Sequence, residues 1–132
     1  MIVVLDCNVW VSLTINSTLK WVSQLFDNGV MIASCSELRN EVTDVLSRPK
    51  LSKFLGPNSS SSALETYDFV TTKFNLSFIP KIISDEKDDY LFALCARSKA
   101  SYLVTGDKLL LNVAVYKHTT IISLADFRRL VK

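Results

Sequence analysis

Short aliphatic segments recur along the chain, separated by longer segments that have one apolar and one polar face. The first of them, Ile2 to Leu5, is a continuous aliphatic run, and Asp6 follows it directly. A run without polar alternation is typical of a strand covered on both faces, as in a parallel sheet with helices above and below. Further strands are predicted at 30–33, 76–79, 102–105 and 120–122.

The longer segments carry apolar residues at helical spacing. Signals at their ends include Asn8 as an N-cap, Asn28-Gly29 as a helix end and Pro49 as a stop. One helix has an almost wholly apolar middle, Tyr90 to Ala96, which predicts a central and buried position. Helices are predicted at 9–15, from 17 or 18 to 26, at 36–48 and 50–55, at about 63–74, from about 85 to 99 and at 124–131.

Strands and helices alternate from one end of the chain to the other. This alternation predicts an α/β fold, a three-layer α/β/α sandwich around a mostly parallel central sheet. The chain has 132 residues, the size of one domain, and only three glycines and three prolines, which argues against an all-β protein with many special turns. We therefore expect residues 1–132 to form a single domain.

Composition narrows the class of protein. Hydrophobic residues make up 48% of the chain and charged residues 21%, which excludes a disordered protein. No apolar run approaches the roughly 20 residues that cross a bilayer, and we expect neither a signal peptide nor a membrane partner. Three cysteines without a C-x-x-C pair predict reduced thiols in a cytoplasmic protein. A net charge of +2 means that any nucleic acid must be held by a local patch.

Carboxylates follow two of the predicted strands. Asp6 comes directly after the first strand, and Asp107 comes two residues after Thr105, at the end of the fourth. Ligands of parallel α/β sheets bind beyond the carboxyl ends of the strands, so both acids are expected at one edge of the sheet. Burying unpaired carboxylates is costly, and a metal ion is a natural partner for them. The alternative for either residue alone is a helix N-cap or a turn.

Two further positions carry acids beside apolar faces. Glu41 lies three residues after the apolar Leu38 in the helix that begins at 36, and its alternative is a solvated helix acid. Asp88 and Asp89 directly precede the apolar middle of the central helix, so at least one of them is expected to point inward. Periodicity does not decide between these two, because both faces downstream are apolar.

Asp6, Glu41, Asp107 and one of Asp88 or Asp89 together form a cluster of oxygen ligands without imidazole or thiolate. Such ligands select Mg²⁺ or Mn²⁺ over zinc or copper. One or two such ions lower the pKa of a bound water and neutralise charge on the attacking and leaving oxygens of a phosphodiester. The cluster therefore predicts metal-dependent hydrolysis of phosphodiester bonds, with no dedicated side-chain base.

These acids and their flanking residues resemble the PIN-domain nuclease family. Residues 3–9, Val-Val-Leu-Asp-Cys-Asn-Val, look like the first strand and D-x-N signature of the family, with Cys7 where threonine is usual. Residues 103–108, Leu-Val-Thr-Gly-Asp-Lys, are similar to its V-T-x-D motif. Glu41 fits the glutamate of the family. Asp89, 18 residues before the acid of the second motif, fits the spacing of the third and fourth acids and is favoured over Asp88.

The resemblance extends over nearly the whole chain, and the layout is most similar to the VapC-like toxins of bacterial and archaeal toxin–antitoxin pairs. It implies a cytoplasmic endoribonuclease that acts on RNA with Mg²⁺ or Mn²⁺, a small antitoxin as partner and a homodimeric state. It also implies that Asn8 and Thr105 orient the ligands or a water on the metal, with Ser12, one helical turn after Asn8, in the same group. A departure is the run at 84–87, Ser-Asp-Glu-Lys, where relatives often show Arg-Asp-Pro. The metal ligands that it implies are Asp6, Glu41, Asp89 and Asp107.

Two other functions stay open at this point. A non-catalytic PIN-like module that binds RNA or protein would keep the fold without the chemistry, although all four acidic positions are filled. A phosphatase with Asp6 as its nucleophile would need a second acid two residues later, where Asn8 stands. Calorimetry with a divalent ion separates the nuclease from the non-catalytic module.

Overall fold

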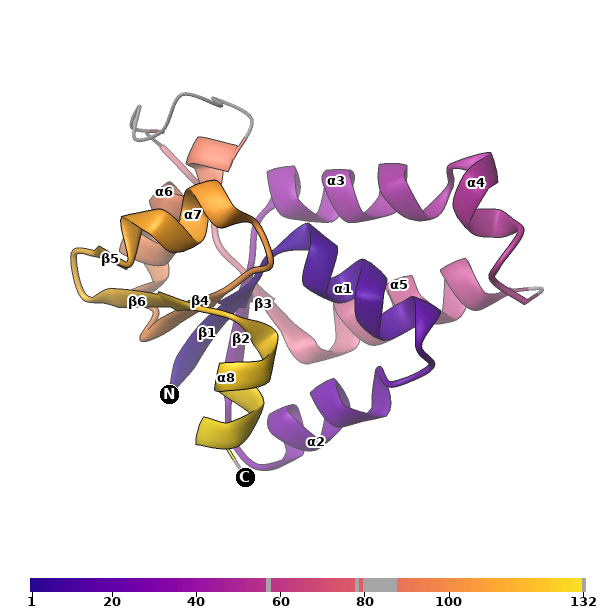
Figure 1. Ribbon diagram of the computed structural model, residues 1–132, viewed down its shortest axis with the longest axis horizontal. Helices are drawn as coiled ribbons and strands as arrows, with labels where there is room; N and C mark the ends of the chain where they lie inside the picture. Colours follow the sequence, from indigo (N-terminus) through magenta and orange to yellow (C-terminus); the bar gives the residue numbers. More distant parts are fainter. Residues whose placement is uncertain (57, 78, 80–87, 132) are drawn as a thin grey trace.

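Six strands form one sheet in the order β3-β2-β1-β4-β6-β5 (Figure 1). The computed structural model describes residues 1–56, 58–77, 79 and 88–131. β1 and β4 lie at the centre, and all neighbouring strands are parallel except β5 and β6. The strands are β1 (Ile2–Leu5), β2 (Met31–Ser34), β3 (Thr71–Lys73), β4 (Tyr102–Val104), β5 (Val115–Tyr116) and β6 (Thr119–Ile122).

Helices cover both faces of the sheet, so the predicted three-layer α/β architecture is confirmed. α6 packs against β1 and β2 and lies behind the sheet in Figure 1, with α8 in front of it. Within the described ranges, none of these helices has the length and apolar character that crossing a membrane requires. The helices are α1 (Cys7–Ile15), α2 (Lys20–Asp27), α3 (Ser36–Leu46), α4 (Pro49–Ser52), α5 (Ser59–Val70), α6 (Asp89–Ser98), α7 (Lys108–Val113) and α8 (Leu124–Leu130).

The core lies along the central strands and α6. The last three residues of β1, 3–5, are fully buried, as the continuous aliphatic run predicts for a strand covered on both faces. Leu91, Phe92 and Leu94 of α6 are also fully buried, which confirms the central position predicted for this helix. Because each large apolar side chain stabilises the fold by about 1.5–3 kcal/mol when it leaves water, α6 is a main contributor to stability.

The third strand differs from the prediction. The pattern at 76–79 predicts a strand and the preceding pattern a helix that continues to Phe74, but α5 ends at Val70 and β3 follows at once. Leu76 is in no strand, and residue 78 lies outside the described residues. β3 is an edge strand paired only with β2, and two of its three residues are exposed. An exposed edge strand lacks the apolar run on which the prediction depends.

Two of the predicted helix boundaries are also corrected. Asp6, rather than Asn8, caps α1, because its carboxylate accepts the N–H of Cys7 and the helix begins two residues earlier than expected. Pro49 begins α4 instead of stopping α3, which ends at Leu46. Proline suits the first position of a helix because its missing N–H would have no partner there. The predicted N-cap at 84 or 85 lies outside the described residues.

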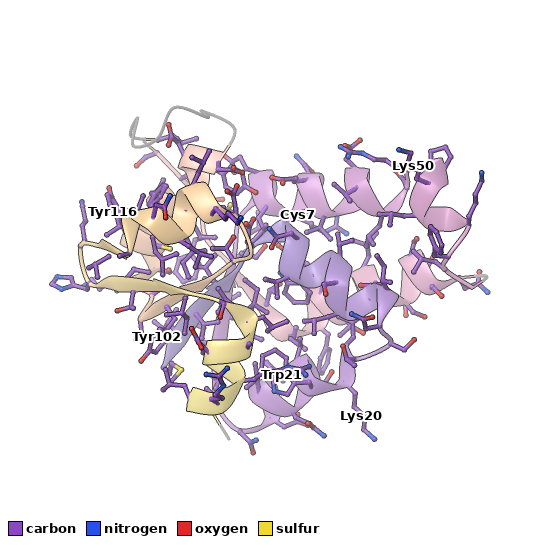
Figure 2. The ribbon with its side chains drawn as sticks, in the orientation of Figure 1. Cys7, Lys20, Trp21, Lys50, Tyr102 and Tyr116 are labelled. Carbon is purple, nitrogen blue, oxygen red and sulfur yellow. The ribbon has the colours of Figure 1, made fainter. Side chains whose placement is uncertain are left out.

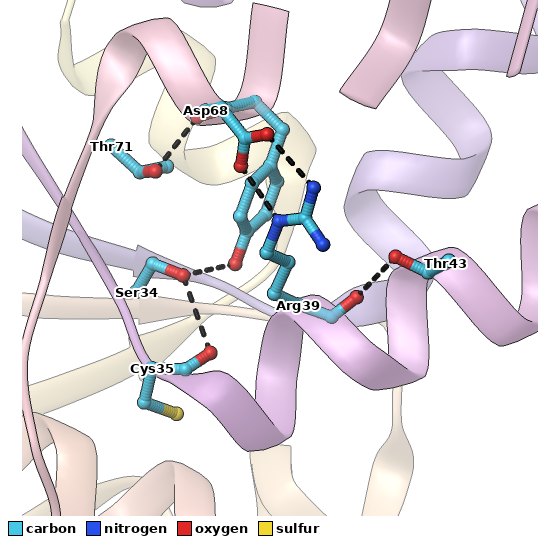
Figure 3. Close-up of polar contacts among 7 residues, drawn as sticks. Ser34, Cys35, Arg39, Thr43, Asp68 and Thr71 are labelled. Atoms are coloured by element: carbon cyan, nitrogen blue, oxygen red, sulfur yellow. Dashed lines mark hydrogen bonds and ion pairs between the residues drawn. The ribbon is translucent and has the colours of Figure 1, made fainter. Parts of the chain in front are cut away.

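α3 is fastened to α5 by polar contacts (Figure 3). Arg39 on α3 donates hydrogen bonds of 2.7 and 2.8 Å to the two carboxylate oxygens of Asp68 on α5. The hydroxyls of Tyr67 on α5 and Ser34 on β2 form a buried hydrogen bond. These contacts fix the orientation of α3 beside the sheet, and α3 carries Glu41.

Candidate active site

A cavity of about 490 Å³ lies beyond the carboxyl ends of β1 and β4, between α1 and α3. Its apolar side is made by Val11 and Ile15 of α1 and Val45 of α3. No lysine, arginine or histidine of the described residues lines it. Four acids from separate parts of the chain line its other side: Asp6, Glu41, Asp88 and Asp107.

Asp6 lies where β1 passes directly into α1. Its Oδ1 accepts a hydrogen bond of 2.7 Å from the backbone N–H of Cys7, and its Oδ2 accepts one of 2.7 Å from the hydroxyl of Thr105. The Asp6 side chain is buried, with 4% of its surface exposed. Both carboxylate oxygens are therefore held in fixed positions at the edge of the cavity.

The surroundings of Asp6 disfavour its charged form. Burial raises the pKa of Asp6 from its ordinary value of 3.8 to about 6, against the opposing effect of the hydrogen bonds from Thr105 and Cys7. The negative charges of Glu41 and Asp107 raise this pKa further. A carboxylate in this position is stabilised by any cation that enters the cavity, because the cation offsets both the neighbouring charges and the loss of water.

Thr105 and Asp107 connect the end of β4 to the cavity. The fully buried Thr105 hydroxyl, which donates to Asp6, accepts the N–H of Asp107 at 3.0 Å. The Asp107 carboxylate also caps α7, since its Oδ1 accepts the N–H of Leu109 at 2.9 Å. The helix-cap alternative for Asp6 and Asp107 is thus correct as well, because each carboxylate begins a helix and lines the cavity.

Asn8 joins the two sequence motifs from the side of α1. Its Oδ1 accepts a hydrogen bond of 3.4 Å from the N–H of Gly106, the residue between Thr105 and Asp107. Ser12 lines the same cavity one helical turn later, beside Asn8. The structure therefore brings together Asn8, Ser12 and Thr105 around the acids, and whether they orient a metal ligand stays a prediction.

Glu41 faces α6 across the cavity edge. Its Oε2 accepts a hydrogen bond of 2.6 Å from the hydroxyl of Tyr90, whose side chain is buried, with 7% exposed. Burial and the bond to Glu41 raise the pKa of Tyr90, so the phenol stays protonated. The thiol of Cys7 lies at the start of α1 (Figure 2), and burial together with the charges of Glu41 and Asp6 raises the pKa of Cys7 to about 12.

The two candidate acids at the start of α6 differ in their surroundings. Asp88 precedes the helix and lines the cavity with the other three carboxylates. Asp89 is the first residue of α6, is only 2% exposed and is not among the residues that line the cavity. The structure therefore groups Asp88, which the motif spacing ranks second, with Asp6, Glu41 and Asp107.

Sequence reasoning did not find two of the contacts at this site. Tyr90 and the thiol of Cys7 both approach Glu41, and neither was expected to do so. One signal was present, because Tyr90 carries the only hydroxyl in the apolar stretch from 90 to 96 that follows the paired acids. A buried phenol needs a hydrogen-bond partner, and an acid on a neighbouring element is a suitable one.

The donor set can be compared with the requirements of a metal ion. Carboxylate oxygens are the ligands that Mg²⁺ and Mn²⁺ prefer, and the cavity offers them from four positions. Among the described residues, however, no group of three or more His, Cys, Asp or Glu side chains is close enough together to hold a metal ion. The chemistry of the donors fits a hard divalent ion. To bind a single ion together, the carboxylate side chains must turn inward from the walls of the cavity.

The fold and the cavity define a class of α/β protein with a parallel sheet, whose ligands bind beyond the carboxyl ends of the strands, where acids from several elements line a cavity here. The family model described as PIN domain matches residues 2–109 of this chain. The chain belongs to the PIN-domain family, and the resemblance seen in its motifs is confirmed.

The fold is also similar to one chain in the crystal structure of VapBC2 from Rickettsia felis bound to a DNA fragment from their promoter. The TM-score is 0.61 at 17% sequence identity, and the match covers 93% of this chain and 98% of the other. No curated protein sequence matches the chain. At this identity the structural likeness establishes the fold, over nearly the full length of both chains.

Proposed function

We propose that this protein is a metal-dependent endoribonuclease, the toxin of a type II toxin–antitoxin pair. The observation that carries the proposal is the one cavity lined by Asp6, Glu41, Asp88 and Asp107 on a PIN-domain fold. A cavity lined by four acids and, among the described residues, by no lysine, arginine or histidine attracts a divalent cation, and such ions serve phosphodiester hydrolysis.

Asp6, Glu41 and Asp107 would hold a Mg²⁺ or Mn²⁺ ion together with an acid from the start of α6. When bound, such an ion supplies an activated water at neutral pH and neutralises charge on the scissile phosphate. The chain itself prepares the site: the Thr105 hydroxyl and the Cys7 N–H fix the Asp6 carboxylate. Contacts of this kind keep ligand carboxylates oriented and usually affect metal affinity strongly.

We propose Asp88, rather than Asp89, as the fourth carboxylate, because Asp88 lines the cavity and Asp89 does not. Asp88→Asn is expected to lower RNA cleavage by about 10-fold or more, while Asp89→Asn keeps most of the activity per folded protein. Both variants are compared for cleavage rate and for circular dichroism. The reverse ranking would restore the assignment favoured by motif spacing.

The nuclease activity is tested with a fluorescently labelled single-stranded RNA. Cleavage is expected with Mg²⁺ or Mn²⁺, none with excess chelator, and at least about 100-fold less with Asp6→Asn. Asp126→Asn, at an exposed acid on α8, is the matched control and should cut like the wild type. Undiminished cleavage by Asp6→Asn would refute the proposal.

A non-catalytic PIN-like module that binds RNA or protein is the second candidate. The observation that favours it is the absence, among the described residues, of three ligating side chains close enough for one ion. Isothermal titration calorimetry with Mn²⁺ separates the two functions. Binding of Mn²⁺ that is lost in Asp6→Asn supports the nuclease, and no binding of Mn²⁺ by the wild type supports the module.

We further propose a small antitoxin as protein partner, the cytoplasm as compartment and a homodimer as the assembly state. The antitoxin proposal draws on the fold shared with a chain of the VapBC2 structure. Three buried free cysteines suit a reducing compartment.

The dimer proposal rests on an exposed aromatic pair. Phe26 of α2 and the 75% exposed Phe69 of α5 lie edge to face, with ring centroids 5.5 Å apart, and offer an apolar surface to a second copy. Sedimentation is expected to show a dimer that Phe69→Asp dissociates.

A further inference from the structure

Tyr90 is the one hydroxyl group that reaches Glu41 from another helix among the described residues. Tyr90 belongs to α6 and Glu41 to α3, and 49 positions separate them in the sequence. The donor and acceptor oxygens are 2.6 Å apart, which is short for a neutral hydroxyl and typical of a bond to a charged carboxylate. The ring of Tyr90 is buried in the core, so its hydroxyl is held at a fixed point at the edge of the cavity.

Glu41 needs such a restraint more than Asp6 and Asp107 do. Asp6 and Asp107 have short side chains that the caps of α1 and α7 already hold. Glu41 has a longer side chain, and the charge of Asp6 beside it favours rotation toward solvent. No basic residue of the described part of the cavity lining opposes that rotation.

The bond to Tyr90 uses one oxygen of the carboxylate. Because the hydroxyl donates to Oε2, the bond to Tyr90 leaves the second oxygen, Oε1, to other partners, which are the nearby thiol of Cys7 or a cation in the cavity. A neutral donor also holds Glu41 without replacing its charge, whereas a lysine or arginine in the same place would neutralise it and compete with a metal ion. The geometry thus restrains Glu41 and preserves its capacity to bind a cation.

We propose that Tyr90 is a positioning residue that holds Glu41 in the orientation from which it binds the divalent ion. The proposal rests on the proposed function, since it assigns Tyr90 a part in the same metal site. Tyr90 touches neither the ion nor the substrate, and acts only through the carboxylate.

The test is calorimetric titration of Mn²⁺ into the protein without RNA. Tyr90→Phe, which removes a single oxygen atom, is expected to weaken Mn²⁺ binding about tenfold. Tyr67→Phe is the matched control, because Tyr67 is also buried and its hydroxyl bonds to Ser34, away from the acids. Tyr67→Phe should lower stability and leave the Mn²⁺ affinity unchanged.

A double variant tests whether Tyr90 acts through Glu41. In a Glu41→Gln background, Tyr90→Phe should change the Mn²⁺ affinity less than twofold, because the ligand that Tyr90 holds has already been lost. Equal effects of Tyr90→Phe in both backgrounds would show general damage to the site and overturn the proposal. Unchanged or tighter Mn²⁺ binding by Tyr90→Phe alone would overturn it as well.

A measurement on the wild-type sequence keeps the proposal testable if Tyr90→Phe does not fold. The chain has four tyrosines, so labelling with 3-fluorotyrosine gives four fluorine resonances, assigned with Phe variants at 67, 102 and 116. Saturating Mg²⁺ should shift the Tyr90 resonance and leave that of Tyr67 in place. An unmoved Tyr90 resonance with Mg²⁺ bound contradicts the positioning role, whereas no Mn²⁺ or Mg²⁺ binding at all contradicts the proposed function instead.

Discussion

Asp6 combines three tasks in one side chain. It caps α1 by accepting the N–H of Cys7, it accepts a hydrogen bond from the hydroxyl of Thr105 just after β4, and it lines the acidic cavity. The first two contacts stabilise the fold, while burial of its charge opposes folding. A residue with this balance is typical of a functional site, where stability is given up for binding capacity.

The stability cost of Asp6 can be measured through its pH dependence. Its pKa is about 6 in the folded protein and 3.8 ordinarily, so protonated Asp6 favours the fold below pH 3.8, and this contribution is lost as the pH rises through 6. Asp6→Asn keeps a cap oxygen without the charge. The free energy of unfolding of Asp6→Asn should therefore exceed that of the wild type by about 2 kcal/mol at pH 7.5, and by less than about 1 kcal/mol at pH 4.

Urea denaturation at the two pH values, without divalent ions, checks this expectation. Addition of Mn²⁺ should stabilise the wild type and leave Asp6→Asn unchanged, because a ligand stabilises only the state that binds it. A variant that is less stable than the wild type at pH 7.5 would show that the hydrogen bonds of the Asp6 carboxylate outweigh the cost of burying its charge.

Individual residues differ in how far their roles could be predicted. The locations of Asp6 and Asp107 were predictable because Asp6 directly follows a strand and Asp107 lies a few residues beyond another, and the sheet geometry brings both to one edge. The choice between Asp88 and Asp89 was not, since adjacent residues at a helix start diverge by about 100° and both neighbouring faces are apolar. The role of Tyr90 depends on where α3 approaches α6, which is a tertiary contact without a local signal.

At the scale of elements, α3 is the helix whose orientation matters most to the cavity. It carries Glu41 and is held by α5 through Arg39 and Asp68, as Figure 3 shows. The two hydrogen bonds run in parallel to one carboxylate, which is the geometry that makes an arginine–aspartate pair effective. The side chains are still about half exposed, at 43% and 50%, so water weakens the interaction.

Asp68→Asn tests this connection between α3 and α5. The free energy of unfolding should fall by about 0.5–1 kcal/mol at neutral pH, as is usual for a well-formed surface ion pair. Arg39 holds the pKa of Asp68 below its ordinary value, so the stabilisation exists at neutral pH and is lost on acidification through that lowered pKa. Urea denaturation in low and high salt measures it, and the difference between variant and wild type should shrink at high salt.

Asp126→Asn provides a comparison, since the Asp126–Arg129 pair on α8 makes one hydrogen bond of 3.2 Å and is more exposed. Its effect should stay below about 0.5 kcal/mol. Equal losses for the two variants would mean that the two-bond geometry of Arg39 and Asp68 contributes nothing beyond an ordinary surface charge.

The elements themselves were predictable where burial leaves a clear pattern. β1, β4 and α6 are mostly buried, and their apolar runs predicted their location to within a few residues. β3, α7 and β5 were missed or misplaced because they are short and largely exposed, so neither period is visible in them. α7 begins at the Asp107 cap, which the sequence offered only as an alternative to a metal ligand, with no helix predicted after it.

At the scale of the whole molecule, the segment after residue 109 completes a fold whose family match ends there. β6, which belongs to this segment, pairs with β4, and α8 covers one face of the sheet (Figure 1). Phe127 of α8 is fully buried, with ring centroids 6.0 Å from Trp21 of α2 and 5.9 Å from Tyr102 of β4. This aromatic group joins the first and last parts of the chain.

Phe127→Ala should therefore lower the free energy of unfolding by about 3–5 kcal/mol, which is the usual loss when truncation of a buried phenylalanine creates a cavity. Phe54→Ala, at a side chain that is 77% exposed, should change it by less than about 0.5 kcal/mol. Thermal and urea denaturation of both variants checks the contrast. A loss under 1 kcal/mol for Phe127→Ala would mean that α8 folds independently of the rest.

Both edges of the central sheet end in very short strands. β3 has three residues, of which Thr72 and Lys73 are exposed, and β5 has only two. Such edges present few backbone groups, and β3 also carries the charge of Lys73, so extension of the sheet by strand addition and amyloid-like stacking are both disfavoured. We therefore expect a macromolecular partner to contact the helices and loops of this protein rather than its sheet edges. The sequence of these helices and loops can differ between related proteins without disturbing the sheet that supports the acids.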